Sequence, residues 1–292
     1  MKNKTFQALL IVAFVVLSVM IIVPFLFVIS ISLSNETDIG LYGYKLWPMQ
    51  FDLTAYRYIF KNPAQILRAY GVTAQFSFVS TILGVFFMAL AAYPLSSPKF
   101  RGKSALSFFL YFTMLFSGGL VPSYILITRY LHLDDTIWVY ILPGLISPWY
   151  IFMIRTFFAG LPYDIVESAF LDGAGHYRIF FTMILPMSKP VIATVGLFVF
   201  LGKWNDWYTS MLYINKETLV SLQYMLQRIM QNIQLLQQSS MTTGGSLLEQ
   251  MKIPSETVRM GMAVVVAGPA LFVFLFFQKY FVQGLTIGSV KG

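Results

Sequence analysis

Long apolar runs separated by short polar stretches dominate the chain. Six runs are each long enough to cross the roughly 30 Å of bilayer hydrocarbon as an α-helix. Pro143, Pro148 and Pro269 fall within these runs and should kink or break their helices. The pattern predicts an all-α integral membrane protein with six transmembrane helices, at about Ala8–Ser32, Gly71–Ser96, Ala105–Arg129, Ile137–Phe158, Pro190–Ile214 and Met260–Phe281.

The composition fits a membrane protein. Hydrophobic residues make up 57% of the 292 positions and charged residues only 11%, less than half of the roughly 25% that soluble domains carry. A soluble enzyme, a disordered chain and a nucleic-acid-binding protein do not fit this composition. The net charge of +8 is typical of basic residues on cytoplasmic loops. The chain has no cysteine, which excludes disulfides, thiolate metal sites and a thiol nucleophile.

The positive-inside rule orients the predicted bundle. The first run follows Lys2 and Lys4 and is longer than the apolar part of a signal peptide, so we interpret it as an uncleaved helix. Placing the N-terminus inside divides the 20 Lys and Arg residues evenly between the two sides of the membrane. The orientation must therefore be decided from the charges of the short loops. The loop Ser97–Ser104 is basic with no acidic residue, whereas Tyr130–Thr136 carries two aspartates and no Lys or Arg. We therefore expect both termini in the cytoplasm.

Two regions follow from this topology. Residues 1–70 hold the first transmembrane helix and an extracytoplasmic segment, and residues 71–292 form a five-helix core. The core includes a cytoplasmic loop at about 158–190 and an extracytoplasmic segment at about 215–259. That segment contains an amphipathic pattern, which predicts a helix lying on the bundle or the membrane interface, or a docking platform for an external partner. Ser239–Ser246 is expected to be a flexible loop tip. The residues of the pattern are Leu222, Leu226, Ile229, Ile233 and Leu236.

The sequence lacks the motifs that several kinds of chemistry require. There is no G-x-x-x-x-G-K-[ST] phosphate loop, and the two histidines, His132 and His176, are far apart. We therefore expect no enzyme activity, no bound cofactor and no protein-built zinc site. The first four runs have no ionisable residue near their centres, which argues against an ion-coupled carrier.

Charges lie away from the ends of one run only, the fifth. Lys203 and Asp206 are three residues apart, so they can pair on a helix. With Trp204, Trp207 and Tyr208 they form either an interfacial ion pair in an aromatic belt or part of a solute path.

The stretch Gly160–Pro190 predicts two short helices around a glycine hinge. Pro162 suits a first helical turn, and Asp172-Gly173 is a turn signal that ends the first helix. We expect Pro186 to end the second helix. An apolar face of this size must be buried, either by the same chain or by another protein that grips it. The second helix forms that face with His176, Ile179, Phe180, Met183 and Ile184.

This stretch resembles the EAA loop of ABC importer permeases, whose pattern is E-A-A, three residues, G, nine residues and I-x-L-P. The chain has Glu167-Ser168-Ala169, three residues, Gly173, nine residues and Met183-x-Leu185-Pro186. The spacing is met throughout, and Ser168 and Met183 are the two departures from the pattern.

The resemblance extends toward the C-terminus. The ending Gly284–Gly292 is similar to the cytoplasmic tail of MalG-type carbohydrate permeases, and Trp204-Asn205-Asp206 is similar to their fifth-helix W-N motif. Phe116–Pro122 and the Gln-rich segment resemble a subgroup linked to complex oligosaccharides. The resemblance covers the chain well from Phe116 onward and the N-terminal third mainly by hydropathy.

The resemblance implies a MetI-like permease fold and a subunit of an ATP-driven importer in the bacterial cytoplasmic membrane. The implied partners are a second homologous permease subunit, two ABC ATPase subunits that carry the ATP and Mg, an extracytoplasmic solute-binding protein and an oligosaccharide or glycan fragment. The alternatives are a permease for another polar solute, an ion-coupled secondary carrier, which usually has internal repeats, and a membrane scaffold.

The resemblance also assigns residues. In such permeases the first loop helix docks on the ATPase, an acidic residue pairs with basic groups there, and small residues allow close approach. The weaker assignments are a translocation path at Trp204, Asn205 and Asp206, and a tail contact at Gly284, Thr286, Gly288 and Lys291, which otherwise form a frayed terminus. The implied coupling residues are Glu167, Ser168, Ala169, Asp172, Gly173, Ala174, Leu185 and Pro186.

Overall fold

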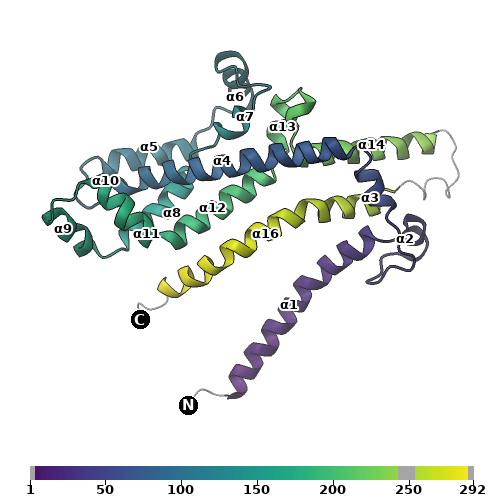
Figure 1. Ribbon diagram of the computed structural model, residues 1–292, viewed down its shortest axis with the longest axis horizontal. Coiled ribbons are helices and arrows are strands. Elements are labelled where there is room, and N and C mark those ends of the chain that lie inside the picture. The colour runs from purple at the N-terminus through teal and green to yellow at the C-terminus, as the bar shows by residue number, and fades with distance from the viewer. Residues whose placement is uncertain (1–3, 243–253, 289–292) are drawn as a thin grey trace. The chain divides into compact units, whose positions relative to one another are not determined.

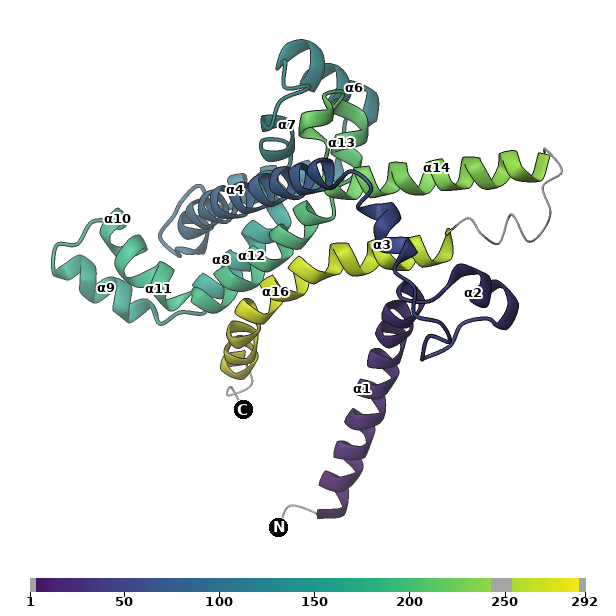
Figure 2. The same cartoon turned by 45° about the vertical axis from the view of Figure 1, so that its right-hand side comes forward.

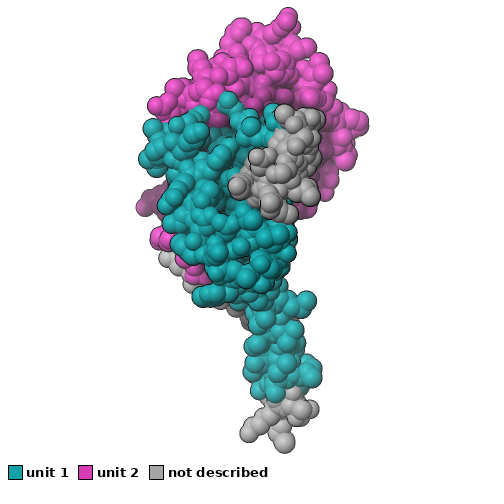
Figure 3. All heavy atoms as spheres, turned by 90° about the vertical axis from the view of Figure 1, so that its right-hand side faces the viewer, with its two compact units in different colours: residues 1–67, 225–269 teal, residues 68–224, 270–292 magenta. Residues whose placement is uncertain are grey.

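The computed structural model describes residues 4–242 and 254–288. This part of the chain is helical, with one isolated β-bridge between Ser34 and Phe51 and no strand. It divides into two compact units, which Figure 3 colours separately. Unit 1 comprises residues 1–67 and 225–269, and unit 2 comprises residues 68–224 and 270–292. The prediction of an all-α chain is confirmed for the described residues.

Unit 1 contains the N-terminal helices. The long apolar α1 (Lys4–Ser32) exposes most of its large side chains, as a helix in contact with lipid does. Asn35 caps the short α2 (Glu36–Tyr42) by accepting the N–H of Thr37 at 2.9 Å, and α3 (Thr54–Ile59) follows. Unit 1 also takes in the first turn of α4 (Pro63–Ser96), most of α14 (Leu222–Thr242) and the first part of α16 (Glu256–Gly288).

Unit 2 contains most of the remaining helices. Helices α4, α5, α8 and α12 run alongside one another, while α9 and α10 lie at one end and α6, α7 and α13 lie toward the other (Figures 1 and 2). Their bounds are α5 (Lys103–Leu115), α6 (Leu120–Ile125), the π-helical η1 (Leu126–Tyr130), α7 (Trp138–Ile141), α8 (Pro148–Ala159), α9 (Tyr163–Leu171), α10 (His176–Ile179), the π-helical η2 (Phe180–Ile184), α11 (Leu185–Met187), α12 (Lys189–Trp204), α13 (Tyr208–Tyr213) and the 3-10 turn η3 (Glu217–Leu219).

The core of unit 2 is built from one face of each long helix. On α4 the buried positions Met88, Ala92 and Leu95 recur at spacings of three and four, which is the period of one helical face. They pack with Ile151 and Ile154 of α8 and with residues of η2 and α12. The loop between α8 and α12 packs on this core through Ala169, Ile179, Phe180 and Ile184.

Three of the six predicted runs are continuous helices, in α1, α4 and α16. α16 continues through Pro269, so this proline does not break it. In the described part of the chain these three are long and apolar enough to cross a membrane, and the number rises to five if each of two bent helix pairs is one span. The structure therefore does not give six unbroken spans.

The other three runs are interrupted, and their backbone shows why. In the third run Gly119 has a φ of 85°, and α6 leaves α5 at 107°. In the fourth run α7 ends before Pro143 and Gly144, the latter with a φ of 70°, and Pro148 starts α8. In the fifth run α12 ends at Trp204, and a separate helix, α13, begins at Tyr208. The expected break at the prolines of the fourth run is thus confirmed, while continuous helices over Ala105–Arg129 and Pro190–Ile214 are wrong.

The predicted amphipathic helix is present as α14. Leu222, Leu226 and Ile233 are buried, in keeping with the expected face. The helix continues to Thr242, so the prediction of a loop beginning at Ser239 is wrong for Ser239–Thr242, and the remainder of Ser239–Ser246 lies outside the described residues.

Candidate functional site

The first helix of the loop that we predict to be cytoplasmic, α9, ends in a Schellman motif around Gly173. The N–H of Ala174 donates to Ala169 O at 2.9 Å, and the N–H of Gly173 donates to Phe170 O at 3.0 Å. Gly173 has a φ of 80°, which a residue with a Cβ adopts only at a cost. The predicted turn at Asp172-Gly173 is therefore confirmed, and the glycine sets the angle between α9 and α10.

Glu167 lies on the exposed side of α9 and forms an ion pair. Its Oε1 accepts from the ammonium of Lys99 at 3.2 Å, and the side chains are 54% and 70% exposed. This hydrogen bond is the largest of the effects that raise the pKa of the Lys99 ammonium above its ordinary value. The Lys99 ammonium also lies 5.5 Å from the centre of the Tyr163 ring. The loop after α4 and the helix α9 are therefore on the same side of unit 2.

The structure divides the predicted coupling residues between surface and core. Glu167, Ser168, Asp172 and Pro186 are exposed, and Ala174 and Leu185 are half-buried. Ala169, in contrast, is only 4% exposed and belongs to the core of unit 2. The small side chain at this position therefore lets α9 pack on its own chain, whereas close approach to a partner was expected.

Two exposed apolar side chains of the loop were missed by the sequence analysis. Leu171, at the end of α9, is 85% exposed, and Tyr177, in the first turn of α10, is 79% exposed. Leu171 is four residues after Glu167, so helical spacing alone places Leu171 and Glu167 on one face of α9.

The second loop helix ends at Met187, one residue after Pro186, and the chain bends by 79° before α12, in keeping with the expected stop at this proline. α10, η2 and α11 run without a break to Met187. The π-helical turn η2 lies directly before Pro186, where the helix must accommodate a residue that has no N–H and whose ring crowds the preceding turn. Ile179, Phe180 and Ile184 are buried as expected, while His176 is exposed.

The W-N motif lies where α12 ends. Trp204 is buried and its ring stacks on Phe200, with centroids 5.7 Å apart. Asn205 is exposed and accepts from the side chain of Gln223 at 2.9 Å. The Oδ1 of Asp206 accepts from the N–H of Thr209 at 3.0 Å, which places the carboxylate at the first turn of α13. Of the three, Asn205 is the most accessible.

Lys203 interacts electrostatically with Asp206, but its close hydrogen bonds go to backbone carbonyls. Its ammonium donates to the carbonyl oxygens of Tyr140 at 2.5 Å and of Pro143 at 3.2 Å. Both oxygens lie where the helix α7 stops, so they lack the helical partners that a continuous helix would supply. The Lys203 ammonium therefore supplies hydrogen bonds to the carbonyl groups at the break in the fourth run, and Asp206 acts on it without a close contact.

The predicted extracytoplasmic segments also contact one another. In unit 2 the carboxylate of Asp135 accepts the N–H groups of Asn215 at 2.5 Å and Lys216 at 2.9 Å. Burial acts to raise the pKa of Asp135, but these hydrogen bonds outweigh it and hold the pKa below its ordinary value. The loops around Tyr130–Thr136 and Asn215 are therefore on one side of the unit.

In unit 1 the carboxylate of Glu36 holds the first turn of α16. It accepts the N–H groups of Ser255, Glu256 and Thr257 at 3.1, 2.9 and 2.9 Å. The hydroxyls of Ser255 and Thr257 donate to it at 3.3 and 2.6 Å. A negative charge at this position satisfies helix donors that otherwise have no partner. No sequence signal links residues more than 200 positions apart.

The tail assignment is only partly within the described residues. Gly284, Thr286 and Gly288 belong to the helical backbone of α16, and Lys291 lies outside the described residues. Among the described residues, no group of three or more His, Asp or Glu side chains could hold a metal ion.

Comparisons with known proteins agree with this arrangement. Residues 69–287 match the family described as "Binding-protein-dependent transport system inner membrane component". Protein LplC of Bacillus subtilis (strain 168) is 37% identical over 271 residues, which cover 93% of this chain and 90% of that protein. The polygalacturonan/rhamnogalacturonan transport system permease protein YtcP of the same strain is 35% identical over 292 residues, and both chains are covered fully.

A solved structure shows the same fold. A chain of a bacterial ABC transporter involved in the import of the acidic polysaccharide alginate superposes with a TM-score of 0.76, at 24% identity. The superposition covers 95% of this chain and 97% of that chain.

Proposed function

The chain belongs to the family of binding-protein-dependent transport system inner membrane components, and we propose that it is one of two permease subunits of an ATP-driven importer of oligosaccharides. In this proposal the second subunit is a homologous permease, two ATPase subunits carry the ATP and Mg, and a solute-binding protein delivers the sugar from outside. The observation that carries the proposal is the α9 surface, where Glu167 and Leu171 project from a helix end fixed by Gly173.

The sugar substrate is supported by the relatives. YtcP, which matches the chain over its full length, is named for the transport of polygalacturonan and rhamnogalacturonan. The chain itself contributes polar groups next to aromatic rings at the end of α12, where Asn205 and Asp206 follow Trp204. We assign Asn205 and Asp206 to the translocation path and give the buried Trp204 the role of holding them in place.

Coupling to ATP hydrolysis follows from the geometry of α9. The exposed residues Glu167, Ser168, Leu171 and Asp172 lie at one end of the helix, and we assign Ala174, Leu185 and Pro186 to the same coupling loop. Since Ala169 anchors α9 to the core of unit 2, a push on α9 is transmitted to the helices that the core contains. Closure of the ATPase pair would thus move these helices as a rigid body.

The proposed topology has six spans with both termini in the cytoplasm, and two sets of contacts support it. The loop after α4 pairs with α9, as two cytoplasmic loops should, and Asp135 binds Asn215, as two extracytoplasmic loops should. Residues 1–70 then form the first span with its extracytoplasmic segment, residues 71–292 form the five-helix core, and the tail from Gly284 to Lys291 contacts the ATPase.

A crosslinking experiment tests the ATPase contact and uses the absence of native cysteines. Leu171→Cys places a thiol on the most exposed apolar residue of α9, and Tyr130→Cys is the matched control, because it is 75% exposed but belongs to the Asp135 side of the unit. In cells, we expect Leu171→Cys to capture an ABC ATPase subunit and Tyr130→Cys to capture none. An inserted Leu171→Cys chain that captures no ATPase would contradict the coupling assignment.

A further inference from the structure

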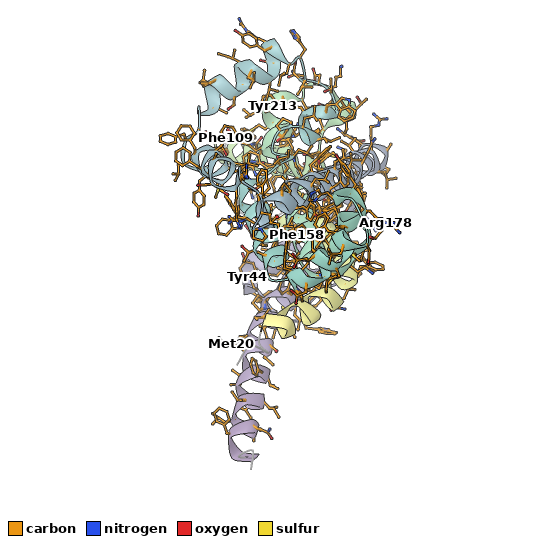
Figure 4. All side chains as sticks on the ribbon, turned by 90° about the vertical axis from the view of Figure 1, so that its left-hand side faces the viewer. Met20, Tyr44, Phe109, Phe158, Arg178 and Tyr213 are labelled. Atoms are coloured by element: carbon orange, nitrogen blue, oxygen red, sulfur yellow. The ribbon has the colours of Figure 1, made fainter. Side chains whose placement is uncertain are left out.

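Unit 2 contains a large cavity beside the proposed coupling helix. Its volume is about 890 Å³, within the roughly 300–1,000 Å³ range of sites that enclose small ligands. It lies between the last turns of α4, the residues that follow them, the end of α8 and the α9–α10 pair. Figure 4 labels Phe158, which lines the cavity, and Arg178, which belongs to α10.

The cavity wall has an apolar part and a polar part. Leu90, Phe158, Phe180 and Ile184 contribute apolar surface, and of these Phe158, Phe180 and Ile184 are buried core residues. The polar side chains of the lining include Tyr93, Tyr163 and His176, and Lys99 contributes an ammonium group. A ligand that fits both parts has an apolar body and a negatively charged head.

The position of the cavity selects the kind of amphiphile. α4 is a candidate membrane span that ends at Ser96, and the cavity is lined by residues on both sides of that point. It is therefore placed where hydrocarbon meets the aqueous phase. The loop Ser97–Ser104 contains Lys99, Arg101 and Lys103 and no acidic residue. Basic pockets between membrane helices on the cytoplasmic side are a recognised binding environment for anionic lipid head groups.

Lys99 retains capacity for such a head group. An ammonium has three N–H donors, and Lys99 forms hydrogen bonds with Glu167 and Tyr163, which leaves one donor for a head group. Its side chain is largely exposed at the rim, so a phosphate can reach it without displacing the ion pair. The rim thus offers a cation for the head group, and the apolar wall offers space for an acyl chain.

We propose that the cavity binds an anionic phospholipid, with one acyl chain between α4, α8 and η2 and the phosphate on Lys99. Tyr163, Val166 and Phe170 of α9 form part of the same wall, so the bound lipid stabilises the position of the coupling helix. The site uses the proposed topology only to choose the cytoplasmic leaflet. Lipid binding itself needs an inserted chain and no transport activity.

Photocrosslinking in membranes tests the site. The probe is a phosphatidylglycerol with a diazirine in one acyl chain, applied to the assembled transporter in vesicles of phosphatidylcholine. We expect labelled peptides from the end of α4 and from α8, with labelling lowered by excess phosphatidylglycerol and not by phosphatidylcholine. Lys99→Gln should lower the labelling about five-fold, the effect of removing one basic residue near an anionic lipid.

Two further variants separate a built site from general attraction. Arg101→Gln is the matched control, because it removes the same charge from the same loop but from a residue that does not line the cavity. It should leave labelling unchanged. Val166→Trp fills the cavity and should abolish labelling of both peptides while Lys99 is still present. Equal losses in Lys99→Gln and Arg101→Gln, or labelling spread evenly over the exposed face of α1, would overturn the proposal. Because the readout is labelling, it stands apart from any failure of ATP-driven uptake.

Discussion

Gly173 offers the sharpest test of the proposed coupling role of the loop. Its φ of 80° lies in the left-handed region, and no atom lies within 4 Å of the position that a Cβ would occupy. A substitution there therefore meets no steric clash with neighbours, and its cost comes from the backbone alone. For alanine this cost is about 1–2 kcal/mol, and it is smaller for asparagine and larger for a β-branched residue.

This magnitude predicts a graded series. A penalty of about 1–2 kcal/mol shifts the ratio of native to altered loop conformations by roughly 5–30-fold. The altered conformation loses the two hydrogen bonds that end α9, so Leu171 and Glu167 no longer present the same surface. We expect transport-coupled ATP hydrolysis to fall in the order Gly173, Gly173→Asn, Gly173→Ala and Gly173→Val, with unchanged amounts of inserted protein.

The loop supplies a matched control for this series. Gly175 has a φ of −75° and also has no atom near its Cβ position, so Gly175→Ala adds the same methyl group without the backbone penalty. It should leave ATP hydrolysis at the wild-type rate. If Gly175→Ala were as impaired as Gly173→Ala, or if Gly173→Val behaved as wild type, the argument from backbone geometry would be refuted.

Three further predictions concern other parts of the chain. Glu36→Gln keeps the shape of the side chain but removes the charge at the first turn of α16, so it should cost about 1–2 kcal/mol and lower the Tm of the purified protein; an unchanged Tm would contradict the capping role. The pKa of Asp135 is lowered in the folded protein, so its stabilising effect is complete above the ordinary carboxyl pKa and is lost as the pH falls through the lowered value. The Tm gap between wild type and Asp135→Asn should therefore be largest near neutral pH and close in acid, and a constant gap would exclude the linkage. Trp204→Ala should destabilise the chain by about 3–5 kcal/mol, because it empties a buried ring site, whereas the exposed Trp207→Ala should change Tm little; equal losses in a thermal melt would contradict this placement.

The local features of the fold were predictable from the sequence, because each depends on neighbouring residues. The turn at Gly173 follows from an Asp-Gly pair, and the amphipathic α14 follows from the spacing of Leu222 and Leu226. The break before Pro148 was expected from the prolines. The break at Gly119 was not, because hydropathy averages over a window and does not register a single positive φ inside an apolar run.

The contacts between distant segments were not predictable. Glu36 and Thr257 are 221 residues apart, and Lys99 and Glu167 are 68 residues apart, so no local pattern relates them. Lys203 had a nearby carboxylate as an expected partner, but the carbonyl groups released by the broken fourth run compete for its ammonium. Only the folded arrangement shows where those oxygens lie.

The central claim is that this chain couples ATP hydrolysis on a partner to the passage of a sugar. The direct measurement is uptake of a panel of labelled oligosaccharides into vesicles that contain the assembled transporter, with its solute-binding protein outside and ATP inside. For any sugar that enters, we predict that uptake stops when ATP is replaced by a non-hydrolysable analogue and when Gly173→Val is present. Uptake that continues without ATP hydrolysis and follows an ion gradient would contradict the account.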